Sequence, residues 1–341
     1  MWSGARGRLR HVTSSNGVTG TGIERRRYPD AEPRYRLAGP YASPGNWLRP
    51  KNSLNLMSTP APCRVIGVAT EVTVMNRIDP AQIQDFQEDG AVALRGLFRE
   101  WVEPLRAAIE RNMAEPSAGA RIYPAKDGSG LFFGDYCNWS RFAEYADFLR
   151  HSALAETCAA LMGARTVRLF HEHVLVKEPG TDMPTPWHHD QPYYSVDGQQ
   201  NCSVWVALDT VPRDTAVEFI AGSHRWGRWF RPEKFDRTAL YEDDGLEAVP
   251  DIDAERGRYR VLGWDLEPGD AVAFHFLTLH GAPGNRATGR RRRAFSARVV
   301  GDDARWAVRK GRTSPPFAGV TLAPGDPLQG PEFPVLYPRP A

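Results

Sequence analysis

The chain has 341 residues, a mass of 38.1 kDa and a formal net charge of +2, with 41% hydrophobic and 25% charged residues. This composition is ordinary for a folded globular protein, and the near-neutral charge does not suggest a nucleic-acid-binding protein. No apolar stretch reaches the length of a membrane span, and the four cysteines, at positions 63, 137, 158 and 202, lack metal-finger spacing. We therefore expect a cytoplasmic protein with free thiols; its oligomeric state stays open.

The first segment, residues 1–75, differs in composition from the remainder. It is rich in Arg, Gly, Pro and Ser, and it has neither sustained apolar periodicity nor the hydrophobic region of a secretory signal. We expect a disordered extension. A reading frame that starts too early is an alternative, because Met75 directly precedes the first ordered pattern, and an amphipathic, arginine-bearing organelle presequence is a less favoured one.

Helical patterns follow. Asp79 is a plausible N-cap with Pro80 in the first turn, and a helix is predicted from there toward Gly90. A second, amphipathic helix over about 99–114 is predicted by apolar residues that recur at helical spacing, namely Val102, Leu105, Ile109 and Met113. Two further helical stretches, near 140–150 and 152–162, complete an N-terminal helical layer.

The next part of the chain reads as β-strands separated by Gly and Pro turns. The predicted strands are 165–177, 185–190, 201–209, 216–221, 258–265, 271–277 and 293–300. Most connections contain no helical pattern of crossover length, which favours an antiparallel sandwich or barrel over a βαβ sheet. We predict a mainly β domain over residues 76–310, followed by a Pro-rich C-terminal tail over residues 311–341.

Two histidines and one carboxylate stand out as candidate metal ligands. In an extended strand, residues two apart project to the same face, so His188 and Asp190 can converge on one ion while His189 points away. The third ligand must come from another strand, and His280 follows the apolar run 271–277. A His₂-carboxylate set suits Fe(II) and leaves three positions open, two for a bidentate co-substrate and one for dioxygen.

A rival pair lies on the strand 165–177, where His171 and His173 share one face. The pair lacks the glutamate and spacing of a cupin metal motif, so we interpret these histidines as cavity-lining or structural. Lys177, on the same face, either reaches the co-substrate or is a solvated lysine at the strand end. Trp205 either lines the metal pocket or is an ordinary core tryptophan.

A run of four arginines, 290–293, follows His280 at a distance of about one strand. The planar fork of a guanidinium can grip the distal carboxylate of a dicarboxylate co-substrate. Parity along the next strand places Ala294, Ser296 and Arg298 on one face, and Arg292 falls on that face. We therefore prefer Arg292 for this role, with Arg291 as the alternative because counting from His280 favours it.

The chain resembles the phytanoyl-CoA dioxygenase family of Fe(II)/2-oxoglutarate-dependent oxygenases over about residues 80–306. The segments that carry the resemblance are Phe86–Phe98, Trp187–Gln191, Ser203–Asp209, Phe219–Arg225, His280–Asn285 and Arg293–Ser296. The resemblance implies a double-stranded β-helix with flanking helices, iron held by His188, Asp190 and His280, and 2-oxoglutarate held by Arg292. The arginine lies one residue further from the second histidine than is usual.

The expected reaction is hydroxylation of an unactivated C–H bond of a small organic substrate, with succinate and CO₂ as co-products. Asp190 favours hydroxylation over chlorination, because an iron halogenase needs the carboxylate absent so that halide can bind. The substrate class stays open between acyl-CoA, amino-acid-like and secondary-metabolite compounds. Tentative substrate contacts are Gln191, Tyr193, Tyr194 and His173, and Ser296 is a further candidate on the co-substrate side. The alternatives are a non-catalytic metal-binding barrel and a cupin-type metalloenzyme independent of 2-oxoglutarate.

Overall fold

The computed structural model describes residues 78–125, 128, 130–233, 245–285 and 289–339. The expected N-terminal extension, residues 1–75, lies outside this part of the chain. No helix within the described residues combines the length and the apolar character that a membrane crossing requires.

Four α-helices form where the sequence predicts them: α1 (Pro80–Asp89), α2 (Val102–Ala114), α3 (Ala143–His151) and α4 (Leu154–Met162). The start of α1 is a capping box, in which the Asp79 carboxylate accepts the Ala81 N–H at 2.9 Å and the Gln82 side chain accepts the Asp79 N–H at 3.1 Å. A short 3₁₀ turn, Arg99–Trp101, precedes α2, so the helix expected over 99–114 is confirmed with a tighter first turn.

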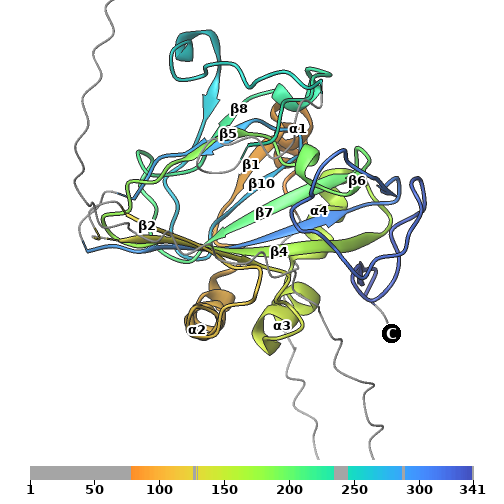
Figure 1. Cartoon of the computed structure of the whole chain (residues 1–341), viewed down its shortest axis with the longest axis horizontal. Helices are drawn as coiled ribbons and strands as arrows, with labels where there is room; N and C mark the ends of the chain where they lie inside the picture. Colours follow the sequence, from red (N-terminus) through yellow and green to blue (C-terminus); the bar gives the residue numbers. More distant parts are fainter. Residues whose placement is uncertain (1–77, 126–127, 129, 234–244, 286–288, 340–341) are drawn as a thin grey trace, which may run out of the picture. The chain divides into compact units, whose positions relative to one another are not determined.

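The large sheet is antiparallel, in the order β1-β10-β7-β12-β4-β3-β2, with β14 also paired to β4. Its strands are β1 (Ala91–Leu94), β2 (Arg121–Pro124), β3 (Leu131–Tyr136), β4 (Val167–Lys177), β7 (Asn201–Ala207), β10 (Ala271–Phe274), β12 (Arg292–Val300) and β14 (Val335–Tyr337). Helices α2 and α3 lie against one side of this sheet (Figure 1). The opposite side faces the second sheet.

The smaller sheet has the order β5-β11-β8-β9 and is also antiparallel. Its strands are β5 (Thr185–His188), β8 (Glu218–Ile220), β9 (Val261–Leu262) and β11 (His280–Ala282), and a separate ribbon joins β6 (Val196–Asp197) to β13 (Arg305–Trp306). One cavity is lined by residues of both larger sheets. The prediction of a mainly β jelly-roll with a helical flank is confirmed.

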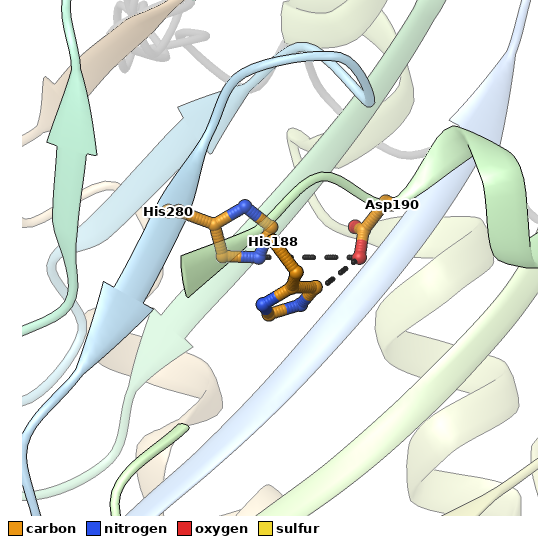
Figure 2. A group of neighbouring side chains, drawn as sticks. All are labelled: His188, Asp190 and His280. Atoms are coloured by element: carbon orange, nitrogen blue, oxygen red, sulfur yellow. Dashed lines mark ion pairs between the residues drawn. The ribbon is translucent and has the colours of Figure 1, made fainter. Parts of the chain in front are cut away.

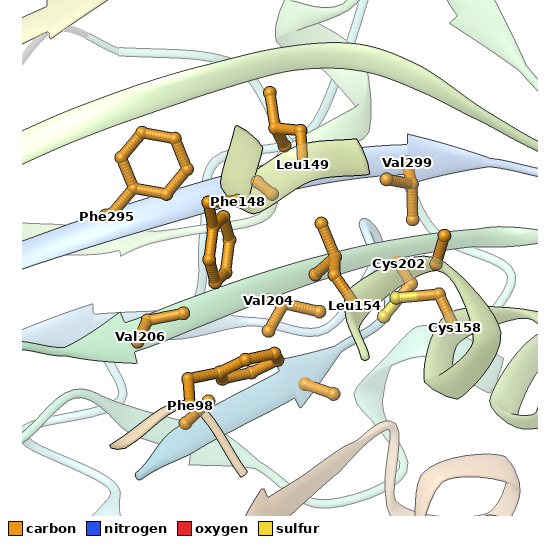
Figure 3. Packing of buried hydrophobic residues seen from close by; sticks show 14 of the residues in the cluster. Phe98, Phe148, Leu149, Leu154, Cys158, Cys202, Val204, Val206, Phe295 and Val299 are labelled. Carbon is orange, nitrogen blue, oxygen red and sulfur yellow. The ribbon is translucent and has the colours of Figure 1, made fainter. Parts of the chain in front are cut away.

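Strand β12 shows how the sequence divides the two faces. Phe295, Ala297 and Val299 are fully buried in the core shared with the helices, and the Phe295 ring lies 5.3 Å from that of Phe148 (Figure 3). Arg292 and Arg298, of opposite parity, line the cavity. The predicted period-two alternation is therefore confirmed.

Strands β1, β2 and β3 were not predicted, and of the strand expected over 258–265 only the two residues of β9 are in a strand. Three further segments differ from the predictions. The strand expected over 185–190 ends at His188, because the chain enters the 3₁₀ turn Gln191–Tyr193. The strand expected over 271–277 ends at Phe274, because the chain turns there toward β11. The C-terminal segment is more than a tail: β14 extends the large sheet, and Phe333 and Leu328 are buried beside Phe170 in an aromatic cluster.

Candidate metal centre and cavity

The three predicted ligands converge at one end of the smaller sheet (Figure 2). His188 and His280 are directly opposite each other in the β5–β11 pairing, and their ring centroids are 4.2 Å apart. The Asp190 Oδ1 atom lies 3.7 Å from His188 Nε2 and 3.9 Å from His280 Nε2. Among the described residues these are the metal-capable side chains that gather in a group of three, with ligand atoms within 4.8 Å of one another.

Asp190 reaches this position by a different route from the one predicted. It lies outside the strand, in helical backbone conformation (φ −73°, ψ −39°), and it begins the 3₁₀ turn Gln191–Tyr193. Its N–H donates to Phe276 O at 2.7 Å, which fixes the turn against the β10–β11 connection. His189 points away as expected, and its Nε2 accepts the N–H of Phe230 at 2.9 Å.

Backbone carbonyls set the tautomers of both histidines. His188 Nδ1 lies 2.7 Å from Pro186 O, and His280 Nδ1 lies 2.9 Å from Thr278 O. A carbonyl only accepts, so each Nδ1 carries the proton and each Nε2 offers a lone pair to the centre. Burial lowers the pKa of His280 to about 3 and that of His188 below its ordinary value, so both rings are neutral near pH 7.

The Asp190 carboxylate is held on its outer oxygen. Its Oδ2 accepts a hydrogen bond from Ser203 Oγ at 3.1 Å and lies 3.9 Å from Arg298 Nε. Burial alone would raise the pKa of Asp190, but the positive charge of Arg298 and the nearby histidines bring it to about 2. The carboxylate is therefore anionic with Oδ1 directed at the histidines. Two neutral imidazoles and one carboxylate are a donor set that fits Fe(II).

A pair of buried cations lies on the same cavity wall. Arg292 and Lys177 are cross-strand partners in β12 and β4, and both are nearly inaccessible to solvent. Arg292 donates to Thr215 O, while Lys177 Nζ donates to Thr185 Oγ1 at 3.2 Å and to Pro283 O at 3.1 Å. Neither has a carboxylate partner within the described part of the chain.

Buried charges normally have a counter-charge, so the pair is suited to a bound anion. Burial, and after it the charge of Arg292, lowers the pKa of Lys177 well below its ordinary value. A carboxylate placed between the two side chains would favour the charged form of Lys177.

Arg291, which counting from His280 favours, and Arg292, which strand parity favours, lie on opposite sides of the sheet. The Arg291 guanidinium is half-buried and pairs with Glu178 at 2.7 Å and Glu110 at 2.6 Å, and it is absent from the cavity wall. Its charge is already compensated. The geometry therefore favours Arg292 as the group available to a co-substrate.

The other predicted residues divide into those on the cavity wall and those away from it. The cavity has a volume of about 240 Å³, and His171, His173, Tyr193, Tyr194 and Trp205 line it. Tyr194 Oη accepts a hydrogen bond from Arg298 Nε at 2.9 Å, which links this tyrosine to the group beside Asp190.

Gln191 and Ser296 are not on the cavity wall. The 3₁₀ turn directs the Gln191 amide to Gly198 O, at 3.2 Å, so this residue is no longer a candidate for substrate contact. Ser296 faces inward but is completely buried between its register partners Trp205 and His173, whose larger side chains occupy the wall.

Four arginines on the cavity wall were not assigned a role from the sequence, namely Arg298, Arg121, Arg231 and Arg312, and neither was Ser203, which is completely buried beside Asp190. Parity did indicate the side on which two of them lie, because Ser203 alternates with Trp205 and Arg298 alternates with Ser296. No periodic signal was available for the other three, which reach the cavity from a short edge strand and from loops.

Comparison with known proteins agrees with this geometry. The family model described as "Phytanoyl-CoA dioxygenase (PhyH)" matches residues 86–294, which include all three candidate ligands and Arg292. The chain belongs to the phytanoyl-CoA dioxygenase family. Iron is the metal of this family, with 2-oxoglutarate and dioxygen as co-substrates.

Two curated relatives of the phytanoyl-CoA dioxygenase-like chain are similar over part of its length. A "Probable phytanoyl-CoA dioxygenase" of Caenorhabditis elegans is 24% identical over 164 residues, which cover 46% of this chain and 51% of that protein. The chain thus matches about half the length of this relative. "Dioxygenase cdmD" of Talaromyces verruculosus is 28% identical over 235 residues, which cover 60% of this chain and 69% of that protein.

Solved structures share the fold. The epimerase SnoN, crystallised with Fe³⁺, α-ketoglutarate and nogalamycin RO, superposes with a TM-score of 0.60 at 23% sequence identity, covering 76% of this chain and all (100%) of that one. At this identity the likeness establishes the jelly-roll architecture and leaves the reaction to be argued from the site.

Proposed function

We propose that the chain is an Fe(II)- and 2-oxoglutarate-dependent hydroxylase that acts on an unactivated C–H bond of a small organic substrate. The observation that carries this proposal is the presence, in one cavity, of the His188–Asp190–His280 donor set and the buried Arg292–Lys177 cation pair. The first suits Fe(II), and the second suits the distal carboxylate of 2-oxoglutarate.

The residues of the chain have separable tasks in this scheme. His188 and His280 bind through Nε2, and the carbonyls of Pro186 and Thr278 keep their rings oriented. Ser203 holds Asp190 so that Oδ1 faces the centre. Arg292 and Lys177 orient the co-substrate. Iron, when bound with 2-oxoglutarate and dioxygen, supplies the oxidation of the C–H bond, with succinate and CO₂ as co-products.

Hydroxylation is proposed because Asp190 occupies the position that a halide would need. The same fold in SnoN is described as an epimerase, so fold alone does not determine the outcome at the carbon atom. The buried cavity wall, with Trp205 and Phe274 on one side of the ligands, would exclude water from the reacting carbon.

The proposal is tested by substrate-free turnover. Protein reconstituted with Fe(II) and supplied with 2-oxoglutarate and ¹⁸O₂ is expected to release succinate that carries one ¹⁸O atom, slowly in the absence of substrate. His188→Ala should abolish the label, whereas His151→Ala, which removes an exposed histidine of α3, should retain it. Unlabelled succinate, or none from folded iron-loaded protein, would favour a metal-binding barrel or a cupin-type enzyme.

A further inference from the structure

The cavity wall carries more positive charge than iron and 2-oxoglutarate account for. Besides Arg292, Lys177 and Arg298, three arginines line it: Arg121 of β2, Arg231, and Arg312 of the C-terminal segment. The carboxylates among the described lining residues are Asp190, which is assigned to the metal, and Glu233. Arg121 and Arg312 are therefore cations on the wall that the proposed cofactor and co-substrate do not account for.

Two of these arginines share the cavity wall with one tyrosine, Tyr136 of β3. Arg121 pairs in register with Gly134, two residues before Tyr136, and Arg312 lies two residues before Ser314, which also lines the cavity. Burial raises the pKa of Tyr136, and the charges of Arg121 and Arg312 oppose that rise.

Neither arginine is neutralised. Arg121 Nη1 donates to the carbonyls of Gly119 at 3.0 Å and Ala120 at 3.3 Å, which carry no formal charge. Arg312 makes no hydrogen bond or ion pair with any residue that the structure describes. Two guanidinium forks beside one hydroxyl offer several N–H donors to a planar or tetrahedral oxyanion.

A row of small and apolar residues crosses the sheet next to Arg121. Strand register places Ala294, Leu175, Gly134 and Arg121 in one row across β12, β4, β3 and β2. Gly134 has no side chain, and a Cβ added there would lie 3.1 Å from His173 Nε2. The glycine therefore lets the imidazole of His173 pack against the strand, and Leu175 is the apolar side chain of this row on the cavity wall.

A polar atom on this part of the wall also lacks a partner. His171, which is 3% exposed, has Nδ1 3.2 Å from Glu172 O, whereas its Nε2 is buried without a hydrogen-bond partner. The Tyr136 ring lies 6.5 Å from that of His171 and 5.7 Å from that of His173. A buried, unsatisfied nitrogen costs free energy, so this part of the wall contains an uncompensated polar group beside its apolar surface.

We propose that the substrate is a small organic oxyanion, a carboxylic acid or a phosphate ester, whose charged group binds Arg121 and Arg312 beside Tyr136. Its apolar body lies in the cavity beside Leu175 and His173 and directs a C–H bond toward the metal ligands. This inference rests on the proposed function for the reaction, while the anion site itself stands on the two arginines.

The test uses three naphthalene probes of the same shape and different charge. Protein loaded anaerobically with Fe(II) and saturated with 2-oxoglutarate, so that Arg292 and Lys177 are occupied, is titrated calorimetrically with 2-naphthoate, 2-naphthyl phosphate and the neutral 2-naphthamide. We expect at least one anion to bind about 10-fold or more tighter than the amide, the factor that corresponds to about 1.4 kcal/mol.

The double variant Arg121→Ala/Arg312→Ala should bind all three probes with equal affinity and keep its affinity for the amide. The control is Arg165→Ala/Arg258→Ala, which removes two highly exposed arginines that do not line the cavity and should retain the preference. A preference for naphthoate identifies a carboxylic acid, and a preference for the phosphate identifies a phosphate ester.

Two results would overturn the anion site: equal or unmeasurable binding of all three probes by the wild type, or an anion preference that survives in the double variant. The visible Fe(II)–2-oxoglutarate band, recorded on the same samples, separates this inference from the proposed function. Absence of the band with an intact anion preference would refute the hydroxylase and leave the site standing; the reverse would refute only the site.

Discussion

Replacing Arg292 by alanine should weaken 2-oxoglutarate binding without destabilising the fold. In the free protein Arg292 is 6% exposed, donates to Thr215 O, and lies beside Lys177 with no carboxylate partner in the described structure. A buried cation without a counter-charge destabilises the folded state, so its removal relieves a cost. The residue is therefore expected to contribute to binding at the expense of stability.

The magnitude follows from the contacts that the co-substrate would lose. A hydrogen bond to a charged group contributes about 1.5–3 kcal/mol, so losing the guanidinium should raise the dissociation constant of 2-oxoglutarate by roughly 10- to 150-fold. Lys177 remains and keeps binding measurable. The midpoint of thermal unfolding of the apoprotein should stay the same or rise.

Arg291→Ala is the matched control, because it removes the neighbouring guanidinium on the other side of the sheet. It loses the partly exposed ion pairs to Glu110 and Glu178, which should cost at most about 1 kcal/mol of stability. Its 2-oxoglutarate affinity should stay within about twofold of the wild type, because hydrogen bonds to the co-substrate are unchanged.

The assay is anaerobic titration of Fe(II)-loaded protein with 2-oxoglutarate, paired with thermal unfolding of the apoprotein. Weak binding in Arg291→Ala together with normal binding in Arg292→Ala would refute the assignment. A large loss of apoprotein stability in Arg292→Ala would refute the argument that its charge is uncompensated.

Three further changes test other parts of the structure. Ser203→Ala removes the hydrogen bond to Asp190 Oδ2 and should weaken Fe(II) binding by about 10-fold in a competitive metal titration; unchanged affinity would show that the bond does not position the ligand. Burial raises the pKa of Glu172 from 4.5 to about 8. The stability that the protonated side chain contributes to the fold is therefore fully present below pH 4.5 and is lost as the pH rises toward 8. The free energy of unfolding of Glu172→Gln, measured with urea, should therefore rise relative to that of the wild type by up to about 1.4 kcal/mol per pH unit in that window. Parallel pH profiles of the two proteins would contradict this. Phe295→Ala removes a ring fully buried against the helices and should cost about 3–5 kcal/mol in the same assay, whereas a loss below about 1 kcal/mol would mean that the core repacks.

The parts of the fold that the sequence predicted are those with strong local periodicity. Alternation along β12 predicts that Phe295 and Arg292 lie on opposite faces of the sheet, and it favours Arg292 over Arg291 as the arginine that faces the cavity. Helix α1 has a capping signal in Asp79 and Pro80 that acts within one turn. Such features depend on neighbours in sequence, so pattern alone indicates them.

The features that were missed depend on contacts between distant segments. Asp190 was expected on a strand, but a turn held by the Phe276 carbonyl places it, and that same turn removes Gln191 from the cavity. Strand β3 contains Gly134 and Asp135, residues with low strand propensity, and sheet pairing overrides that preference. Arg121 and Arg312 come to line the same cavity only through the tertiary fold.

The most direct test of the central claim is anaerobic addition of Fe(II) and then 2-oxoglutarate to the apoprotein, followed by visible absorption. The wild type should develop a metal-to-ligand charge-transfer band that is absent in His188→Ala and retained in His151→Ala. A folded wild-type protein that binds iron but shows no band at saturating 2-oxoglutarate would contradict the assignment of the cavity to an oxygenase centre.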